Sequence, residues 1–253
     1  MKPMGSHPSN QWRVDGRTAD LSRAVRKPVR PVALAAEPQS LIVDANRSAL
    51  VVVDMQNDFC CKGGYLDYRG IDITPDRAPI GPLQALVPAL RAQSIPVIWL
   101  NWGVRRDLLN IAPSLLHAHT QDGEGAGLGE KIPGGAEILL EGSWGAQIVD
   151  ELDPGDQDIR VTKHRFSGFW DTPLDSILRN LGVATLFFAG VNADQCVMTT
   201  LQDASFLGYD VIMLRDCVGT TSPAFCMQAT EYNVNLLFGF MSTSGALVQG
   251  LAA

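Results

Sequence analysis

The 253-residue chain has few histidines, few cysteines and no long apolar run, and each shortage excludes a class of protein. No apolar run reaches the roughly 20 residues that a membrane-spanning helix needs. The first residues lack the apolar segment of a secretory signal. The five cysteines are an odd number without framework spacing, which is typical of free thiols in a reducing compartment. We therefore expect a cytoplasmic protein that binds no membrane.

The chain also has no excess of positive charge. The net charge is −7, which argues against nucleic acid or an anionic membrane as the main partner. With 46% hydrophobic and 19% charged residues, the chain can bury a sizeable core. The chain is long enough for one large α/β domain or two small ones.

Apolar runs of strand type alternate with helical patterns from residue 48 onward. We expect six strands, at residues 48–54, 95–101, 158–163, 185–190, 210–216 and 238–242. Helical spacing lies at residues 79–93, 145–152, 172–182, from Cys196 onward, and 223–236. This alternation predicts an α/β fold: a doubly wound, mostly parallel six-stranded sheet with helices on both faces, as in Rossmann-like proteins. Residues 1–47 are expected to form a partly flexible N-terminal arm, and residues 48–253 the domain.

Three polar residues end three of the expected strands or directly follow them. Asp54 and Lys163 end two of them, and Cys196 opens a helix just after a third. The carboxyl ends of parallel strands share one edge, so the three side chains can converge there. A thiol in the first turn of a helix meets the positive end of the helix dipole, which favours the thiolate. Asp54 would accept the thiol proton and Lys163 would orient it.

Each of these residues also has an ordinary structural interpretation. A cysteine at a helix start often fills the core, an aspartate caps the next segment, and a strand-end lysine is usually solvated. Histidine, the usual partner of a catalytic cysteine, is not placed to help. None of the four histidines has the strand-end position of Asp54, and His164 follows Lys163 directly, so the two point to opposite faces.

Other residues near the expected strand ends are candidates for substrate binding. The long connection at residues 103–142 includes a glycine-rich run at residues 122–129, and such a connection is often a lid. The candidates for substrate contact are Gln56, Phe59, Asn101, Arg105 and Phe169. Gln56 has an alternative interpretation, in which its side-chain amide forms hydrogen bonds within the local turn. Arg105 and Arg106 could instead be a pair of solvated basic residues on a loop.

Three motifs resemble those of the isochorismatase-like cysteine hydrolases. They are VDMQNDF at residues 53–59, VTK followed by FSGF at residues 161–169, and GVNADQCV at residues 190–197. The resemblance covers about residues 45–248 and implies the fold of that family, with Asp54, Lys163 and Cys196 as the catalytic triad. It also implies a cis peptide bond between Val191 and Asn192, and an oxyanion hole formed by the backbone N–H groups of Asn192 and Cys196.

Departures from the family pattern narrow the expected chemistry. The Asp-x-His metal motif of nicotinamidases does not occur in the chain, so we expect no metal and no other cofactor. Isochorismatases proper lack the nucleophilic cysteine, so Cys196 indicates cleavage of an amide or ureide. Residues 63–67 and 168–179 are most similar to the ureide branch, which includes ureidoacrylate amidohydrolase, biuret hydrolase and triuret hydrolase. Residues 103–108 are closer to biuret-type enzymes.

The expected substrate is therefore a small, planar, largely uncharged ureide or amide. An arginine at position 105 or 106 pointing into the pocket would favour an acid such as ureidoacrylate, and two solvated arginines would favour a neutral ureide. Alternatives are a hydrolase of another carboxamide or N-carbamoyl compound, a catalytically silent binding scaffold, and a redox sensor that uses Cys196. The arm is suited to clasping a neighbour, so we expect a homo-oligomer, either a dimer or a tetramer.

Overall fold

The protein is described by a computed structural model that covers residues 1–23, 28–120 and 123–253. Its centre is a six-stranded sheet in the order β11-β10-β9-β6-β7-β8, in which every pair of neighbours is parallel. The strands are β6 (Ser48–Val53), β7 (Val97–Trp102), β8 (Ile159–Lys163), β9 (Thr185–Gly190), β10 (Asp210–Val218) and β11 (Phe240–Ser242). The six predicted strands are thus confirmed, with their ends shifted by at most two residues.

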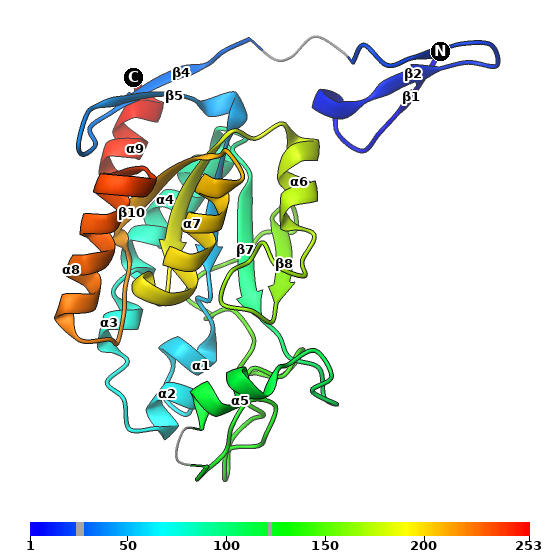
Figure 1. The fold of residues 1–253 in the computed structure, drawn as a ribbon. Coiled ribbons are helices and arrows are strands. Elements are labelled where there is room, and N and C mark those ends of the chain that lie inside the picture. Colours follow the sequence, from blue (N-terminus) through cyan, green and yellow to red (C-terminus); the bar gives the residue numbers. More distant parts are fainter. Residues whose placement is uncertain (24–27, 121–122) are drawn as a thin grey trace.

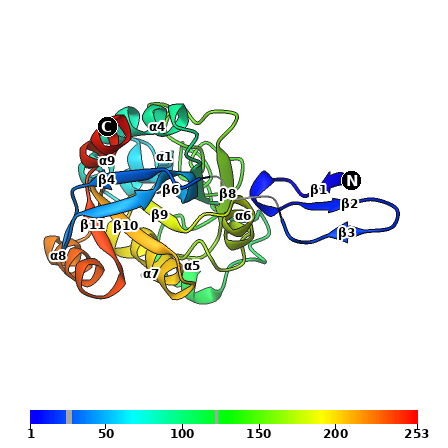
Figure 2. The same ribbon diagram turned by 90° about the horizontal axis from the view of Figure 1, so that it is seen from above.

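Helices cover both faces of this sheet, which confirms the doubly wound fold (Figures 1 and 2). One face carries α4 (Ile80–Ala92) and α9 (Ser244–Ala252). The other carries α6 (Leu174–Leu181), α7 (Met198–Phe206) and α8 (Ala224–Asn233). The central strands β6 and β9 are buried at every position, which explains their unbroken apolar sequences. The edge strand β8 instead alternates between buried and more exposed residues.

The predicted end of α6 is confirmed, and its start lies one residue later than predicted, because Pro173 is at the cap position and Leu174 is the first helical residue. The Thr172 hydroxyl accepts a hydrogen bond from the backbone N–H of Leu174 at 3.1 Å, and Gly182 ends the helix with φ of 72°. The terminal helix α9 was not predicted. The segment with Cys196 begins as a π-helical turn, η3 (Ala193–Val197), which continues into α7.

The prediction of a helix at residues 145–152 is wrong. This segment consists of turns, because several of its backbone groups bond to the loop after β6 and do not form a continuous helical series. Ile148 forms an antiparallel bridge with Gln56, and the N–H of Val149 donates to the carbonyl of Met55 at 3.1 Å. The apolar residues of this segment therefore face the core at helical spacing although the segment is not a helix.

Short helices occupy the connections at the carboxyl edge of the sheet. They are α1 (Asn57–Cys60), α2 (Tyr65–Tyr68) and α3 (Thr74–Arg77) after β6, and α5 (Pro113–His119) between β7 and β8. The turn η2 (Ala45–Arg47) precedes β6, and the turn η4 (Val234–Phe238) follows α8. Of the glycine-rich run at residues 122–129, Asp122 lies outside the described residues.

The N-terminal 47 residues form two separate parts. A small antiparallel sheet of β1 (Lys2–Met4), β2 (Trp12–Val14) and β3 (Ala19–Asp20) projects from the body (Figure 2). It touches α6 through the turn η1 (Pro8–Asn10), where Asn10 donates to the Asn180 side chain at 2.6 Å. The hairpin of β4 (Pro31–Leu34) and β5 (Leu41–Asp44) packs on α9 and buries Val32 and Leu34. No helix in the described residues is long and apolar enough to cross a membrane.

Candidate active site

Asp54, Lys163 and Cys196 meet at the carboxyl edge of the sheet. Asp54 directly follows β6, Lys163 is the last residue of β8, and Cys196 lies in η3, just after β9. Lys163 Nζ is 2.8 Å from Asp54 Oδ2 in an ion pair that lacks the alignment of a hydrogen bond. The side chains of both residues are at most 1% exposed, and Cys196 is 5% exposed. The three side chains therefore form one buried polar cluster.

The pairing of β6 with β9 places Asp54 beside the segment that leads to Cys196. Val53 is level with Gly190, and the N–H of Val191 donates to the carbonyl of Val53 at 2.9 Å. Gly190 has φ of 106°, and a Cβ atom there would collide with the Val53 carbonyl oxygen. Only glycine allows the two chains to approach this closely.

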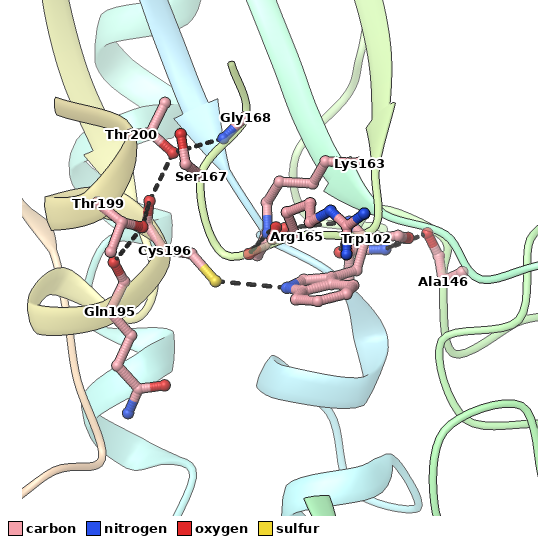
Figure 3. Close-up of polar contacts among 12 residues, drawn as sticks. Trp102, Ala146, Lys163, Arg165, Ser167, Gly168, Gln195, Cys196, Thr199 and Thr200 are labelled. Atoms are coloured by element: carbon pink, nitrogen blue, oxygen red, sulfur yellow. Dashed lines mark hydrogen bonds and ion pairs between the residues drawn. The ribbon is translucent and has the colours of Figure 1, made fainter. Parts of the chain in front are cut away.

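Trp102, at the end of β7, links the lysine to the cysteine (Figure 3). Its indole N–H donates to Cys196 Sγ at 3.3 Å, and Lys163 Nζ lies 4.2 Å from the centre of its ring. Lys163 Nζ also donates to the carbonyl of Arg165 at 3.2 Å. Sequence reasoning missed Trp102, because its place beside Lys163 follows from the register of β7 with β8.

Burial controls the proton affinities of the cluster. Burial raises the pKa of the Cys196 thiol to about 12; the Lys163 ammonium opposes this rise, and the charge of Asp54 adds to it. This rise in the pKa of the thiol opposes the thiolate that the position of Cys196 in the first turn was expected to favour. Burial also raises the pKa of Asp54, with Lys163 opposing in part. A carboxylate with increased proton affinity is a better acceptor for this thiol proton.

The segment that precedes Cys196 is anchored by hydrogen bonds to the loop after β10. The bond between Val191 and Asn192 is cis, as the sequence resemblance implied. The Asn192 side-chain oxygen accepts from the N–H of Thr221 at 3.0 Å, and the N–H of Ala193 donates to the Gly219 carbonyl at 2.7 Å. No group among the described residues accepts a hydrogen bond from the backbone N–H of Asn192.

Gln56 lies beside the site but is bonded to protein groups. Its amide donates to the carbonyls of Trp102 and Ala146, at 2.8 and 2.7 Å, and its oxygen accepts from the N–H of Trp102 at 2.8 Å. Asp54 Oδ1 accepts from the same N–H at 3.0 Å. Gln56 therefore fixes the end of β7, and with it the indole of Trp102.

The other candidates for substrate contact are scattered. Neighbouring residues of a strand point to opposite faces, and Asn101 lines a cavity of ≈ 120 Å³ to which Asp54, Lys163 and Cys196 do not contribute. Phe59 is buried in α1, and Phe169 packs against Tyr209 with ring centres 6.0 Å apart. The exposed Arg105 pairs with Asp107 at 2.6 Å.

The aromatic side chains that surround Trp102 are not the predicted Phe59 and Phe169. The ring of Phe166 meets it edge-on, with centres 5.9 Å apart and planes at 86°, and the ring of His119 lies at 6.0 Å and 75°. Both residues come from irregular segments or short helices, so no periodicity marked them. No group of three or more His, Cys, Asp or Glu side chains in the described part of the chain is placed to hold a metal ion.

Residues 48–244 match the model of the Isochorismatase domain. The chain belongs to the isochorismatase family. It is 38% identical over 212 residues to the ureidoacrylate amidohydrolase RutB of Klebsiella variicola (strain At-22), covering 83% of this chain and 89% of that protein. The same identity and coverage relate it to RutB of Klebsiella pneumoniae (strain 342). The chain is accordingly a hydrolase that acts on amide C–N bonds.

Solved structures share its fold. A cysteine hydrolase from Pseudomonas syringae pv. phaseolicola 1448A aligns with a TM-score of 0.72 at 24% identity, over 90% of this chain and 99% of that one. N-carbamoylsarcosine amidase from Thermoplasma acidophilum aligns with a TM-score of 0.59 at 26% identity, over 78% of this chain and 96% of that one. The isochorismatase-like hydrolase fold predicted from the sequence is thus confirmed.

Proposed function

We propose that the protein is a cofactor-free cysteine amidohydrolase that cleaves a C–N bond of a small ureide. The observation that carries the proposal is the buried cluster in which Lys163 contacts Asp54 at 2.8 Å and Trp102 donates to the sulfur of Cys196. A thiol, a carboxylate and fixed positive charge are the groups that nucleophilic amide hydrolysis requires. The ureidoacrylate amidohydrolases at 38% identity support a ureide as the substrate class.

The proposed reaction begins with transfer of the Cys196 thiol proton to Asp54. The sulfur then attacks the substrate carbonyl carbon and forms a tetrahedral intermediate. Its oxyanion accepts hydrogen bonds from the N–H groups of Asn192 and Cys196. The C–N bond breaks as Asp54 returns its proton to the leaving nitrogen, which leaves an acyl- or carbamoyl-thioester. Water, deprotonated by Asp54, attacks this thioester, and expulsion of the sulfur restores the thiol.

Replacement of the nucleophile tests the covalent route. Cys196→Ser should lower turnover by several powers of ten, because one member of a catalytic unit is lost. Intact-protein mass spectrometry during turnover should detect an adduct on the wild type and none on this variant. Cys226→Ser, on the outer helix α8, is the matched control and should keep full activity. Near-wild-type turnover by Cys196→Ser would exclude the mechanism.

One observation favours a neutral ureide over an acid. The side chain of Arg105 is 57% exposed and pairs with Asp107, and that of Arg106 is 78% exposed and lies 3.9 Å from Glu137. Neither arginine is placed to hold a substrate carboxylate in the buried cluster. Biuret and triuret are therefore candidates beside ureidoacrylate, the substrate that the names of the Klebsiella relatives give.

A panel of substrates separates these candidates. Ammonia release from ureidoacrylate, biuret, triuret and nicotinamide should be highest for one of the three ureides. A preference for biuret or triuret would support the neutral pocket, and a preference for ureidoacrylate would locate a carboxylate site outside residues 105 and 106. Preference for nicotinamide, or no release from any ureide, would contradict the proposed substrate class.

We also propose that the N-terminal arm docks on a second copy of the chain. Residues 1–47 contain eight Lys and Arg against four Asp and Glu, whereas the remainder contains 12 against 23. A basic arm beside an acidic body is complementary to another acidic body. Light scattering of the full chain should give a multiple of 27.3 kDa at low salt, with dissociation favoured at high salt. A monomer at micromolar concentration would exclude this assembly.

A further inference from the structure

His119, the last residue of α5, lies over the catalytic cluster. Its ring is stacked on that of Phe166, with centres 6.4 Å apart and planes at 12°, and its other neighbours are Trp102 and Tyr65. The Tyr65 hydroxyl donates to the backbone carbonyl of His119 at 2.6 Å and so fixes the end of the helix. The imidazole is thus held one aromatic ring away from the sulfur of Cys196.

The hydrogen bonds of the ring determine which nitrogen carries the proton. Nδ1 lies 2.8 Å from the carbonyl oxygen of Leu115, and a carbonyl only accepts, so Nδ1 carries the hydrogen. Burial lowers the pKa of His119, and the charge of Lys163 lowers it further, so the neutral ring is favoured. In a neutral ring with a proton on Nδ1, Nε2 is an acceptor. Among the described residues, no group donates a hydrogen bond to Nε2.

The rest of the cluster offers mostly donors. Lys163, the Trp102 indole and the proposed oxyanion groups all donate, while the two oxygens of Asp54 face Lys163 and the N–H of Trp102. A ureide brings several N–H groups along with the carbonyl under attack. Those N–H groups need an acceptor once water is excluded, because an unpaired buried donor is costly.

We infer that Nε2 of His119 accepts a hydrogen bond from an N–H of the bound ureide and thereby selects N–H-bearing substrates. This role rests on the proposed function, and it assigns His119 as a substrate-binding residue supplied by the connection between β7 and β8. The aromatic side chains around the ring hold the acceptor in place, so little ordering is needed on binding.

The test compares biuret with N-methylated biurets in the wild type and two variants. His119→Phe keeps a flat ring and removes the acceptor, and His119→Gln supplies an amide oxygen. His119→Phe should raise KM for biuret by about 2- to 12-fold, the range of a neutral hydrogen bond, with a smaller change in kcat. Methylation of the recognised nitrogen should raise the KM of the wild type by a similar factor and leave the KM of His119→Phe unchanged. His119→Gln should recover part of the loss.

Two controls separate the possible failures. His117→Phe, at an exposed position on the same helix, should leave KM unchanged. The rate of Cys196 alkylation by iodoacetamide, which needs no substrate, should be equal in the wild type and His119→Phe if the site is intact. An unchanged KM and unchanged discrimination against N-methyl substrates in His119→Phe would overturn the inference while leaving the proposed function standing. Absence of biuret, triuret and ureidoacrylate hydrolysis by the wild type would overturn both.

Discussion

Replacement of Trp102 by phenylalanine should slow the reaction without removing any member of the proposed catalytic triad. The indole N–H donates to Cys196 Sγ at 3.3 Å and opposes the rise that burial causes in the pKa of the thiol. Phenylalanine keeps an aromatic ring beside Lys163 but cannot donate. The variant therefore removes only one hydrogen bond to the sulfur. This bond becomes stronger as negative charge develops on the sulfur.

The expected size of the effect follows from that bond. A hydrogen bond to a charged group contributes about 1.5–3 kcal/mol. At about 1.36 kcal/mol for each factor of ten, its loss should reduce kcat/KM about 10- to 150-fold. The rate of alkylation by iodoacetamide at a fixed pH should fall by a similar factor, because the thiolate fraction falls with it.

Trp99→Phe is the matched control for this substitution. Trp99 is as deeply buried as Trp102, and its indole N–H donates to Asp158 Oδ2 at 2.8 Å, away from the sulfur. Both variants lose an indole donor and similar volume, so their thermal stabilities should fall together. Only Trp102→Phe should alter alkylation. Equal alkylation rates in the two variants would refute the role assigned to the Trp102 N–H.

Other predictions concern the buried charges. Asp54→Asn and Lys163→Met should each reduce ammonia release about 10²–10⁴-fold, and retention of more than a tenth of the activity would contradict the assigned roles. Because burial raises the pKa of Asp54 and the reaction needs its carboxylate, kcat/KM should fall as pH drops through that raised pKa; a profile flat down to pH 4 would count against it. Asp76 is fully buried with both oxygens unpaired, and burial, with the nearby Asp194, raises its pKa to about 8. The folded state holds a proton that the unfolded chain releases, so the wild type should lose stability from about pH 4 to 8, and Asp76→Asn should lose less, as melting temperatures would show. Exhaustive chelation should leave activity unchanged, and strong inhibition would indicate a metal.

The strands and the positions of Asp54, Lys163 and Cys196 at one edge of the sheet could be predicted from the sequence for the same reason. Strands covered on both faces have continuous apolar sequences, and a polar residue that interrupts such a run marks the strand end. Asp54, Lys163 and the segment of Cys196 could be placed by this rule alone. Trp102 could not, because its neighbours depend on which strands are adjacent and in what register.

The wrong helix prediction and the unforeseen hydrogen bonds of Gln56 have a common physical cause. The helical spacing of Ile148, Val149 and Leu152 reflects packing against the core. The backbone of this segment, however, bonds to Met55, Asn57 and Asp58 in the loop after β6. Gln56 likewise looked available for substrate, yet its amide is bonded to backbone groups of other segments. Burial and polarity can be predicted from the local sequence. The distant partner with which a polar group forms its hydrogen bond cannot.

The three residues of the proposed triad lie at the ends of three different strands, and this has a consequence for how the enzyme acquires activity. Asp54 and Lys163 are more than a hundred residues apart in the chain, and Cys196 reaches them only after β9 has inserted beside β6. Contacts of such long range close late, because the loop entropy must be overcome first. Recovery of catalysis after dilution from denaturant therefore reports completion of the whole sheet, and it should lag behind the return of helical circular dichroism.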